Sequence, residues 1–378
     1  MTLAAAAVAA AEALETRAAD AGWRGPDPYD GLWWHWPAWM TGGRRRRQFI
    51  VQVHARSPVD IRRAYRRGHP RIAKTLALFA AAGLRLHAVT GNDASRTRAI
   101  GALDALTADR TAGGLAWGYP FDVQTRWSHY AAGTPNVVVT AFAIQALLAG
   151  ADATGREELA ERARMAARWI LDDLFVEPDG FFSYHPESRV NVHNANVLGA
   201  AAIAAALPDD PHAARAVSRA VDRTLARQAP DGSWEYGEGG NLGWADSFHT
   251  GYVLLSLIRL RRAGFDVDDA IARGARHYTR FFDERGRATL WADRPWPEDA
   301  HSAGTGMSTL AALRELGHVD RGVLERVTAR VLDAGVRGSR AVPRRYRHWR
   351  ATVWYPRWCD GHVALGLADA AVPLAGAA

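Results

Sequence analysis

The chain has 378 residues, of which 48% are hydrophobic and 23% are charged, a composition typical of globular rather than disordered proteins. Its single cysteine excludes an intramolecular disulfide and a cysteine-based zinc site. Lys74 is its only lysine, so a mechanism based on paired lysines is excluded too. The net charge of +7 is spread along the chain, with one run at Arg44–Arg47 and no zinc-finger, RNP or helix-turn-helix spacing. We therefore expect no nucleic-acid partner.

The N-terminal segment is rich in alanine, but Glu12, Glu15 and Arg17 interrupt it on a helical pattern. This pattern predicts an amphipathic first helix over residues 3–20 rather than a signal peptide. No stretch reaches the roughly 18 uninterrupted apolar residues of a membrane span, so we expect a cytoplasmic protein without one. Residues 21–68 form a Trp- and Arg-rich connection, and the alternation in RRQFIVQVHA is a weak strand signal.

From the first helix onward, a unit of roughly 55 residues recurs along the chain, in the order helix, Gly- and aromatic-rich loop, second helix. In each unit the first helix has a charged face, whereas the second is almost entirely small and apolar. A helix that is apolar all round is buried, and one with a charged stripe faces water. We predict an all-α protein, a single domain over residues 1–378 in which six helix pairs close into an (α/α)6 toroid. The pairs lie in residues 3–83, 95–150, 159–207, 212–260, 269–316 and 322–371.

In such a ring, the loops that lead from the outer to the inner helices meet at one rim, and the unusual residues gather there. Aromatic side chains with polar neighbours suit stacking on a ring-shaped substrate. We predict a substrate-binding surface formed by Trp117, Tyr119, Asp122, Gln124, Arg126, Asn136, Tyr184, His193, Asn194, Trp234, Trp244, Trp358 and Asp360. We predict that acid/base groups come from Tyr236, Asp246, His249, Asp299 and His301.

One segment of the fourth pair, ARQAPDGSWEYG, contains Gln228, Gly232 and Trp234 in the pattern QxxxGxW. It resembles the QW motif of squalene and oxidosqualene cyclases, in which the motif is structural. The DxDD signature of protonating cyclases is absent. The resemblance therefore implies a structural role for Gln228 and Trp234 more than a cyclase activity.

A wider resemblance rests on residues 26–34, 57–79, 117–147 and 244–257, which include PDPYDGLWW and WADSFHTGY. These segments are similar to a family of bacterial all-helical toroid proteins encoded among polysaccharide-biosynthesis genes and often labelled delta-aminolevulinic acid dehydratase. A true enzyme of that name is a β/α barrel with paired lysines, which this chain cannot supply. The resemblance implies a toroid, distantly similar to squalene cyclase-like and six-hairpin glycosidase-like proteins, and a glycan context.

The segment WADSFHTGY carries the most specific acid/base candidates. Asp246 and His249 lie three residues apart at a predicted helix start, so both can face the central cavity. The alternative is that Asp246 only caps the helix. Hydrolysis would require a carboxylate pair, for which Asp246 with Asp299 or Asp360 are the candidates. Epimerisation or lysis would require a base that removes a carbon-bound proton, and an imidazole can serve.

Two further patterns at the rim each have an ordinary explanation. His193, His249 and His301 recur in consecutive pairs and suggest a three-His metal site, but repeats place polar residues at one rim anyway, so we expect no metal. Arg126 and the arginines of the RRYRHWR segment are suited to a carboxylate or phosphate, or are solvated surface. The arginines in this segment are Arg344, Arg345, Arg347 and Arg350.

These observations favour a carbohydrate-active enzyme that acts on a glycan by acid/base chemistry, as an epimerase, lyase or hydrolase. One alternative is an isoprenoid or other natural-product cyclase, in which the aromatic cavity would stabilise carbocations. Another is a glycan-binding scaffold without catalysis. We expect a small-molecule or glycan substrate and no cofactor, with a monomer and a homodimer both open.

Overall fold

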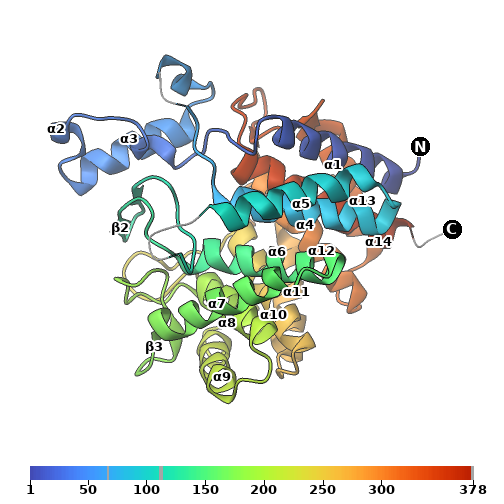
Figure 1. Cartoon of the computed structure of the whole chain (residues 1–378). Helices are drawn as coiled ribbons and strands as arrows, with labels where there is room; N and C mark the ends of the chain where they lie inside the picture. Colours follow the sequence, from blue (N-terminus) through green and yellow to red (C-terminus); the bar gives the residue numbers. More distant parts are fainter. Residues whose placement is uncertain (66–67, 110–113, 376–378) are drawn as a thin grey trace.

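The fold is built around a ring of inner helices (Figure 1). The structure is a computed structural model, and it describes residues 1–65, 68–109 and 114–375. Within these residues, each of six inner helices contacts the next, and the last contacts the first, so the ring is closed. Small and apolar side chains allow this close packing. The inner helices are α4 (Ala73–Thr90), α6 (Val137–Thr154), α8 (His193–Ala206), α10 (Ser247–Arg262), α12 (Ala300–Glu315) and α14 (Gly361–Ala375).

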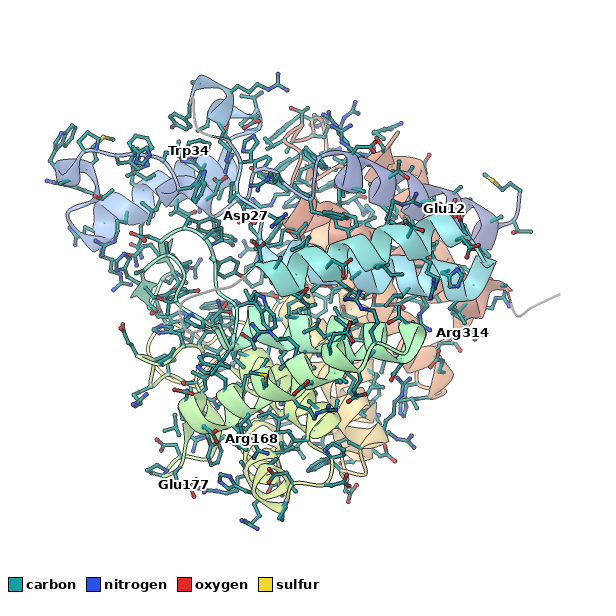
Figure 2. The ribbon with its side chains drawn as sticks, in the orientation of Figure 1. Glu12, Asp27, Trp34, Arg168, Glu177 and Arg314 are labelled. Carbon is teal, nitrogen blue, oxygen red and sulfur yellow. The ribbon has the colours of Figure 1, made fainter. Side chains whose placement is uncertain are left out.

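The outer helices alternate with the inner ones along the chain and pack against them. The helix α1 contacts both α14 and α4, and so joins the last inner helix to the first. Charged side chains such as Arg168 of α7 point outward from this layer (Figure 2). The predicted all-α (α/α)6 toroid is confirmed. The outer helices are α1 (Leu3–Asp20), α5 (Asp93–Ala108), α7 (Glu157–Leu174), α9 (Pro211–Leu225), α11 (Asp268–Tyr278) and α13 (Arg321–Arg330).

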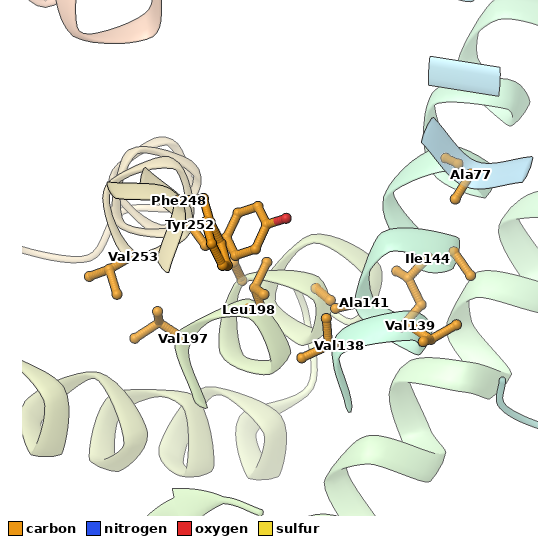
Figure 3. Packing of buried hydrophobic residues seen from close by; sticks show 14 of the residues in the cluster. Ala77, Val138, Val139, Ala141, Ile144, Val197, Leu198, Phe248, Tyr252 and Val253 are labelled. Atoms are coloured by element: carbon orange, nitrogen blue, oxygen red, sulfur yellow. The ribbon is translucent and has the colours of Figure 1, made fainter. Parts of the chain in front are cut away.

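The side chains of neighbouring inner helices form one buried apolar cluster (Figure 3). Figure 3 shows Val138 and Ile144 of α6 with Leu198 of α8 and Val253 of α10. Among the described residues, α6 is the one helix whose length and composition would suit a membrane span. It packs between α4 and α8, and a helix that is apolar all round is typical of a buried core position.

The connection between α1 and α4 contains a projecting helix where the sequence suggested a strand. Within residues 46–55, Ile50, Val51 and His54 are buried while Phe49 and Val53 are exposed. Burial thus follows one face of a helix rather than alternate residues, so the strand expectation was wrong. The connection contains η1 (Asp30–Leu32), α2 (Ala38–Thr41), α3 (Arg44–Arg56) and η2 (Ile61–Ala64), and α2 and α3 extend away from the ring (Figure 1).

The long loops contain short two-residue strands. β1 and β2 pair antiparallel with Val123 opposite Tyr130, whereas β5 pairs with the distant β8. The remaining elements are short helical turns, η3 (Thr279–Phe281), η4 (Val331–Gly335) and η5 (Pro356–Asp360). The strands are β1 (Val123–Gln124), β2 (His129–Tyr130), β3 (Phe175–Val176), β4 (Phe181–Phe182), β5 (Glu298–Asp299), β6 (Val336–Arg337), β7 (Arg340–Ala341) and β8 (Arg344–Arg345).

The QW-like segment links two outer helices. The Gln228 side chain donates hydrogen bonds to the carbonyl oxygens of Gly232 (3.1 Å) and Ala270 (3.0 Å), and it accepts one from Arg273 Nη2 (2.6 Å). The indole of Trp234 donates to the Thr224 carbonyl (3.0 Å). These contacts give Gln228 and Trp234 a structural role at the ends of α9 and α11.

Helices α12 and α14 approach each other most closely at Gly304, where a Cβ atom would lie 2.4 Å from the His362 carbonyl carbon. Gly304→Ala is expected to destabilise the protein by about 1–3 kcal/mol, because the two backbones must move apart. The matched control is Gly101→Ala in α5, where the nearest heavy atom, on Trp23, lies 3.4 Å away. Thermal unfolding measures both, and an equal melting temperature for the two variants would contradict the prediction.

Candidate active site

The start of α10 holds a carboxylate and an imidazole in direct contact. Asp246 caps the helix, since its Oδ1 accepts a hydrogen bond from the His249 backbone N–H at 3.0 Å. Its Oδ2 lies 2.7 Å from His249 Nδ1 and 3.1 Å from the Trp244 indole nitrogen. A carboxylate can only accept, so Nδ1 carries the proton and Nε2 is the basic nitrogen. Asp246 therefore caps the helix with one carboxylate oxygen and orients the His249 ring with the other.

A stack of flat side chains lies over this pair. The Arg126 guanidinium lies 5.0 Å from the centre of the Trp244 ring, and Trp244 stacks on Tyr236 with ring centroids 4.6 Å apart and an angle of 10° between the planes. Tyr236 in turn lies 4.6 Å from His249, centroid to centroid. Burial raises the pKa of Tyr236, so its hydroxyl stays protonated at neutral pH.

A small pocket opens beside His249. Its volume of about 10 Å³ is enough for one water molecule. A sugar ring would enter only if aromatic side chains at this place shifted. The pocket is lined by Asn194, Trp234, Glu235, Tyr236, Trp244, Asp246, His249, Thr250 and Val253.

Deeper in the ring, the hydroxyl of Tyr252 contacts three other buried polar side chains. Tyr252 Oη lies 3.0 Å from Lys74 Nζ, 2.5 Å from His301 Nε2 and 3.1 Å from His362 Nε2. Burial lowers the pKa of Lys74 well below its usual value, and it lowers the pKa values of both histidines. Burial also raises the pKa of Tyr252. Burial thus favours the neutral form of each of these groups. His301 Nδ1 is buried and has no hydrogen-bond partner among the described residues.

Phe248 connects this deep cluster to the pocket. Its ring centroid lies 4.1 Å from that of His249 and 4.3 Å from that of His301. Trp358 packs on the same group, with its ring 4.3 Å from His301 and 5.4 Å from Phe248, centroid to centroid. Two groups of titratable side chains thus lie on either side of one aromatic residue.

The carboxylates proposed as partners of Asp246 serve other purposes. Asp299 caps α12 by accepting from the Ser302 N–H (3.0 Å), and it pairs with Arg344 at 3.4 Å. Asp360 accepts from the Ala341 N–H (3.0 Å) and the Trp354 indole (2.6 Å). Burial raises the pKa of Asp360 to about 7. Of these three aspartates only Asp246 lines the pocket.

Several of the predicted substrate-binding residues make structural contacts. The Trp117 indole donates to the Leu106 carbonyl at 3.1 Å in the core, and Asn136 caps α6 through the Val139 N–H at 3.0 Å. Asp122 accepts from the Ala132 N–H at 2.8 Å.

Three more of the predicted residues contact side chains that do not line the pocket. Gln124 accepts a hydrogen bond from Arg47 Nε at 2.8 Å. Tyr119 stacks on Phe121 at 5.6 Å, and Tyr184 meets the edge of Trp127 at 5.6 Å, between ring centroids. None of these three lines the pocket, whereas Asn194, Trp234 and Trp244 do.

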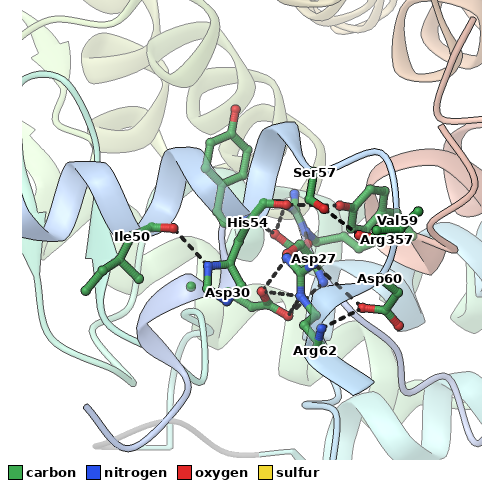
Figure 4. A network of polar contacts seen from close by, with 12 residues as sticks. Asp27, Asp30, Ile50, His54, Ser57, Val59, Asp60, Arg62 and Arg357 are labelled. Atoms are coloured by element: carbon green, nitrogen blue, oxygen red, sulfur yellow. Dashed lines mark hydrogen bonds and ion pairs between the residues drawn. The ribbon is translucent and has the colours of Figure 1, made fainter. Parts of the chain in front are cut away.

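A buried charge network anchors the loop before α14 to the long connection (Figure 4). The Arg357 guanidinium donates to both carboxylate oxygens of Asp27, through Nε to Oδ2 and through Nη2 to Oδ1 at 2.8 Å. Arg62 binds Asp30, with Nη2 2.6 Å from Oδ1, and all four side chains are at most 3% exposed. The sequence analysis missed these residues. The signal was available as charged residues inside the aromatic segments PDPYDG and YPRWCDG.

No group of three His, Cys, Asp or Glu side chains within the described ranges is arranged to hold a metal ion. His193 Nδ1 lies 3.4 Å from Thr224 Oγ1, and its Nε2 lies 3.9 Å from Glu238. His301 instead belongs to the deep cluster. The three recurring histidines therefore belong to three different sets of contacts.

His193 makes the stability of the protein sensitive to acid. Burial lowers its pKa from 6.5 to about 4, so the unfolded chain takes up a proton at a higher pH than the folded one. The stabilisation is complete above about pH 6.5 and is lost as the pH falls toward 4, by about 2–3 kcal/mol. His193→Gln should lose less stability than wild type between pH 7.5 and 4.5 in thermal unfolding. The exposed His212→Gln is the control, and an equal loss in all three proteins would refute the assignment.

No family model and no curated protein sequence matches the chain. Solved structures match it over most of its length. A cellobiose 2-epimerase from Bacillus thermoamylovorans B4167 aligns with a TM-score of 0.64 and 12% identity, over 80% of this chain and 88% of that one. An unsaturated glucuronyl hydrolase from Bacillus sp. GL1 aligns with a TM-score of 0.58 and 13% identity, over 77% and 84%. The shared fold is the (α/α)6 toroid. At these identities the likeness shows the fold alone.

A third match gives the same result. The cellobiose 2-epimerase from Spirochaeta thermophila DSM 6192 aligns with a TM-score of 0.62 and 12% identity, over 82% of this chain and 89% of that one. Large coverage of both chains means that the whole ring is shared.

Proposed function

We propose that the protein is a carbohydrate-active enzyme that moves a proton at a sugar carbon, and that its reaction is an epimerisation in which His249 is the acid/base group. The observation that carries the proposal is the Asp246–His249 pair at the pocket. Asp246 holds Nδ1 of the imidazole at 2.7 Å, which leaves Nε2 as the base. The carboxylate also stabilises the imidazolium that forms when a proton is taken up.

Imidazole chemistry fits this site better than glycoside hydrolysis. Hydrolysis uses two carboxyl groups on opposite sides of the scissile bond. Asp299 and Asp360 are bonded to Arg344 and Trp354, and they do not line the pocket. Epimerisation instead requires removal of a proton from one face of a carbon and its return to the other. A neutral imidazole can remove the proton, and a protonated group on the other side of the carbon must return one.

A second acid/base group is available across Phe248. His301 and His362 share the Tyr252 hydroxyl, and burial holds both imidazoles neutral. The Tyr252 hydroxyl can donate a hydrogen bond to one imidazole and accept one from the other. A substrate that displaced the Phe248 ring would lie between His249 and this cluster.

A sugar substrate is supported by the proteins that share the fold. Two of the matched structures are described as cellobiose 2-epimerases and another as an unsaturated glucuronyl hydrolase. The aromatic stack of Trp244 and Tyr236 offers flat surfaces of the kind on which sugar rings pack. The sequence resemblance to toroid proteins of polysaccharide-biosynthesis clusters suggests a glycan-biosynthesis setting as part of the same proposal.

The test follows the sugar C–H bond in deuterated water. Purified protein is incubated with reducing disaccharides, one neutral and one containing a uronate, and the C2–H signal is followed by proton NMR. Exchange of that hydrogen together with formation of an epimer is expected. Cleavage without exchange would identify a hydrolase and an unsaturated product a lyase, and either would overturn the epimerase assignment. Sugar binding without any reaction would favour the scaffold alternative and overturn it too.

A further inference from the structure

Five arginines gather where the projecting helix α3 meets the β1–β2 hairpin. Arg44 of α3 donates to the carbonyl oxygen of Arg126, and Arg47 donates to Gln124 at 2.8 Å. Gln48 adds a hydrogen bond to the Thr125 carbonyl at 3.1 Å. We call Arg44, Arg45, Arg46, Arg47 and Arg126 the rim arginine cluster. These contacts fix the hairpin, and Arg126 on it, against α3.

The rim arginine cluster has no acidic counterpart. Within the described ranges, none of its five members forms an ion pair with an aspartate or glutamate, and all but Arg47 are exposed. On the outer helices, by contrast, arginines have acidic partners, as in Arg164–Glu157 and Arg219–Glu177. Neighbouring like charges repel, so a positive patch of this kind concentrates anionic ligands at its surface.

The cluster is continuous with the pocket. Arg126 lies over Trp244, and the indole of Trp244 donates to the same Asp246 oxygen that holds His249. A guanidinium that lies on an aromatic ring can still direct its N–H edge at a carboxylate and bind it through two hydrogen bonds. Arg126 therefore lies where a charged substituent of a sugar at His249 would emerge.

The cluster also extends away from the pocket along α3. Trp39 and Phe49 are 70% and 71% exposed there, although large apolar side chains are usually covered. Arg46 donates to the Trp39 carbonyl and so fixes the position of that residue against α3. Exposed aromatic rings on the segments that carry the arginines suit a chain of sugar rings with negative charges.

We propose that the rim arginine cluster binds the carboxylate groups of an acidic oligosaccharide, with Arg126 binding the carboxylate of the sugar unit at the pocket. The inference rests on the proposed function in that it names the substrate class of the same site. Arg44, Arg45 and Arg46 contact the following units, and Trp39 and Phe49 pack on their ring faces. An acidic glycan fits better than a nucleic acid because the cluster leads to a pocket with acid/base groups.

Binding is measured by titration calorimetry without turnover, using tetragalacturonate as the acidic probe and cellotetraose as the neutral one. Arg126→Gln is expected to weaken tetragalacturonate binding about tenfold or more, since hydrogen bonds to charged groups are lost, and to leave cellotetraose binding unchanged. The triple variant Arg44→Gln/Arg45→Gln/Arg46→Gln should bind tetragalacturonate more weakly than wild type does, and should bind monomeric galacturonate equally well. Arg215→Gln is the control, an exposed arginine of α9 without an ion pair among the described residues.

Equal binding of tetragalacturonate by wild type and Arg126→Gln would overturn the inference. So would an equal loss in Arg215→Gln, which would mean that only net charge matters. Tighter binding of single-stranded DNA or of anionic lipid vesicles than of tetragalacturonate, measured at the same ionic strength, would assign the cluster to those partners instead. The outcomes are separable from the proposed function, because Arg126-dependent binding can persist in a protein that exchanges no deuterium.

Discussion

Replacing His249 with Asn is expected to lower the rate of sugar C–H exchange at least about hundredfold, the usual contribution of a positioned acid/base group. Asn keeps a polar side chain at the first turn of α10, and the backbone N–H of residue 249 can still donate to the capping oxygen Asp246 Oδ1. The variant should therefore fold. Exchange rates measured by NMR at saturating substrate report the loss. His212→Asn on the exposed start of α9 serves as the matched control.

The partner variant separates orientation from chemistry. In Asp246→Asn the amide can accept one hydrogen bond but no longer offers a carboxylate to His249 Nδ1 and the Trp244 indole. We expect turnover to fall with little change in KM, because Asp246 acts by orienting His249 through Nδ1. If both variants fold and keep wild-type exchange, Asp246 and His249 are not the acid/base groups, and the cluster of Tyr252, His301 and His362 becomes the site to test.

The ring was predictable because its signals are local. Each inner helix is apolar on all sides and each outer helix has a charged face, so a repeat of helix pairs specifies two concentric layers. The strand predicted in residues 46–55 was wrong because the burial of this segment depends on its place in the tertiary structure. Helix α3 lies outside the ring, and only Ile50, Val51 and His54 are covered there. Its two exposed apolar residues, Phe49 and Val53, made the pattern look alternating.

The site was predictable only where its residues are close in sequence. Asp246 and His249 are three residues apart, so helix geometry alone brings them together. Lys74 and Tyr252 are separated by 178 residues, and Tyr252 and His362 by 110. Their contact depends on which turns of the inner helices face each other at the ring centre. A single sequence does not encode that register in any local pattern.

The anchoring of the long connection was also invisible to local patterns, since Asp27 and Arg357 are 330 residues apart. Their side chains are 0% and 3% exposed. The pair joins the segment after α1 to the segment before α14, and it places the Arg357 guanidinium 5.3 Å from the Tyr119 ring centroid and 5.2 Å from that of Trp358. Closure of the ring and the aromatic lining near His301 thus depend on the same contact.

Arg357→Met is therefore expected to destabilise the protein by about 3–5 kcal/mol, because it leaves the Asp27 carboxylate buried without its partner. Met is similar in length and keeps the apolar contacts of the side chain. Urea unfolding measures the loss. The double variant Asp27→Asn/Arg357→Met should recover part of the stability, because no charge then remains buried.

The matched control is Arg164→Met, which removes the exposed pair with Glu157 and should cost at most about 1 kcal/mol. A loss in Arg357→Met no larger than in this control would show that water reaches Asp27 in the variant. The connection would then be held mainly by the Arg62–Asp30 pair, which is also fully buried. Because the two pairs share a backbone contact, from the Asp27 N–H to Asp30 Oδ2 at 3.0 Å, removing both arginines should cost more than the sum of the single losses.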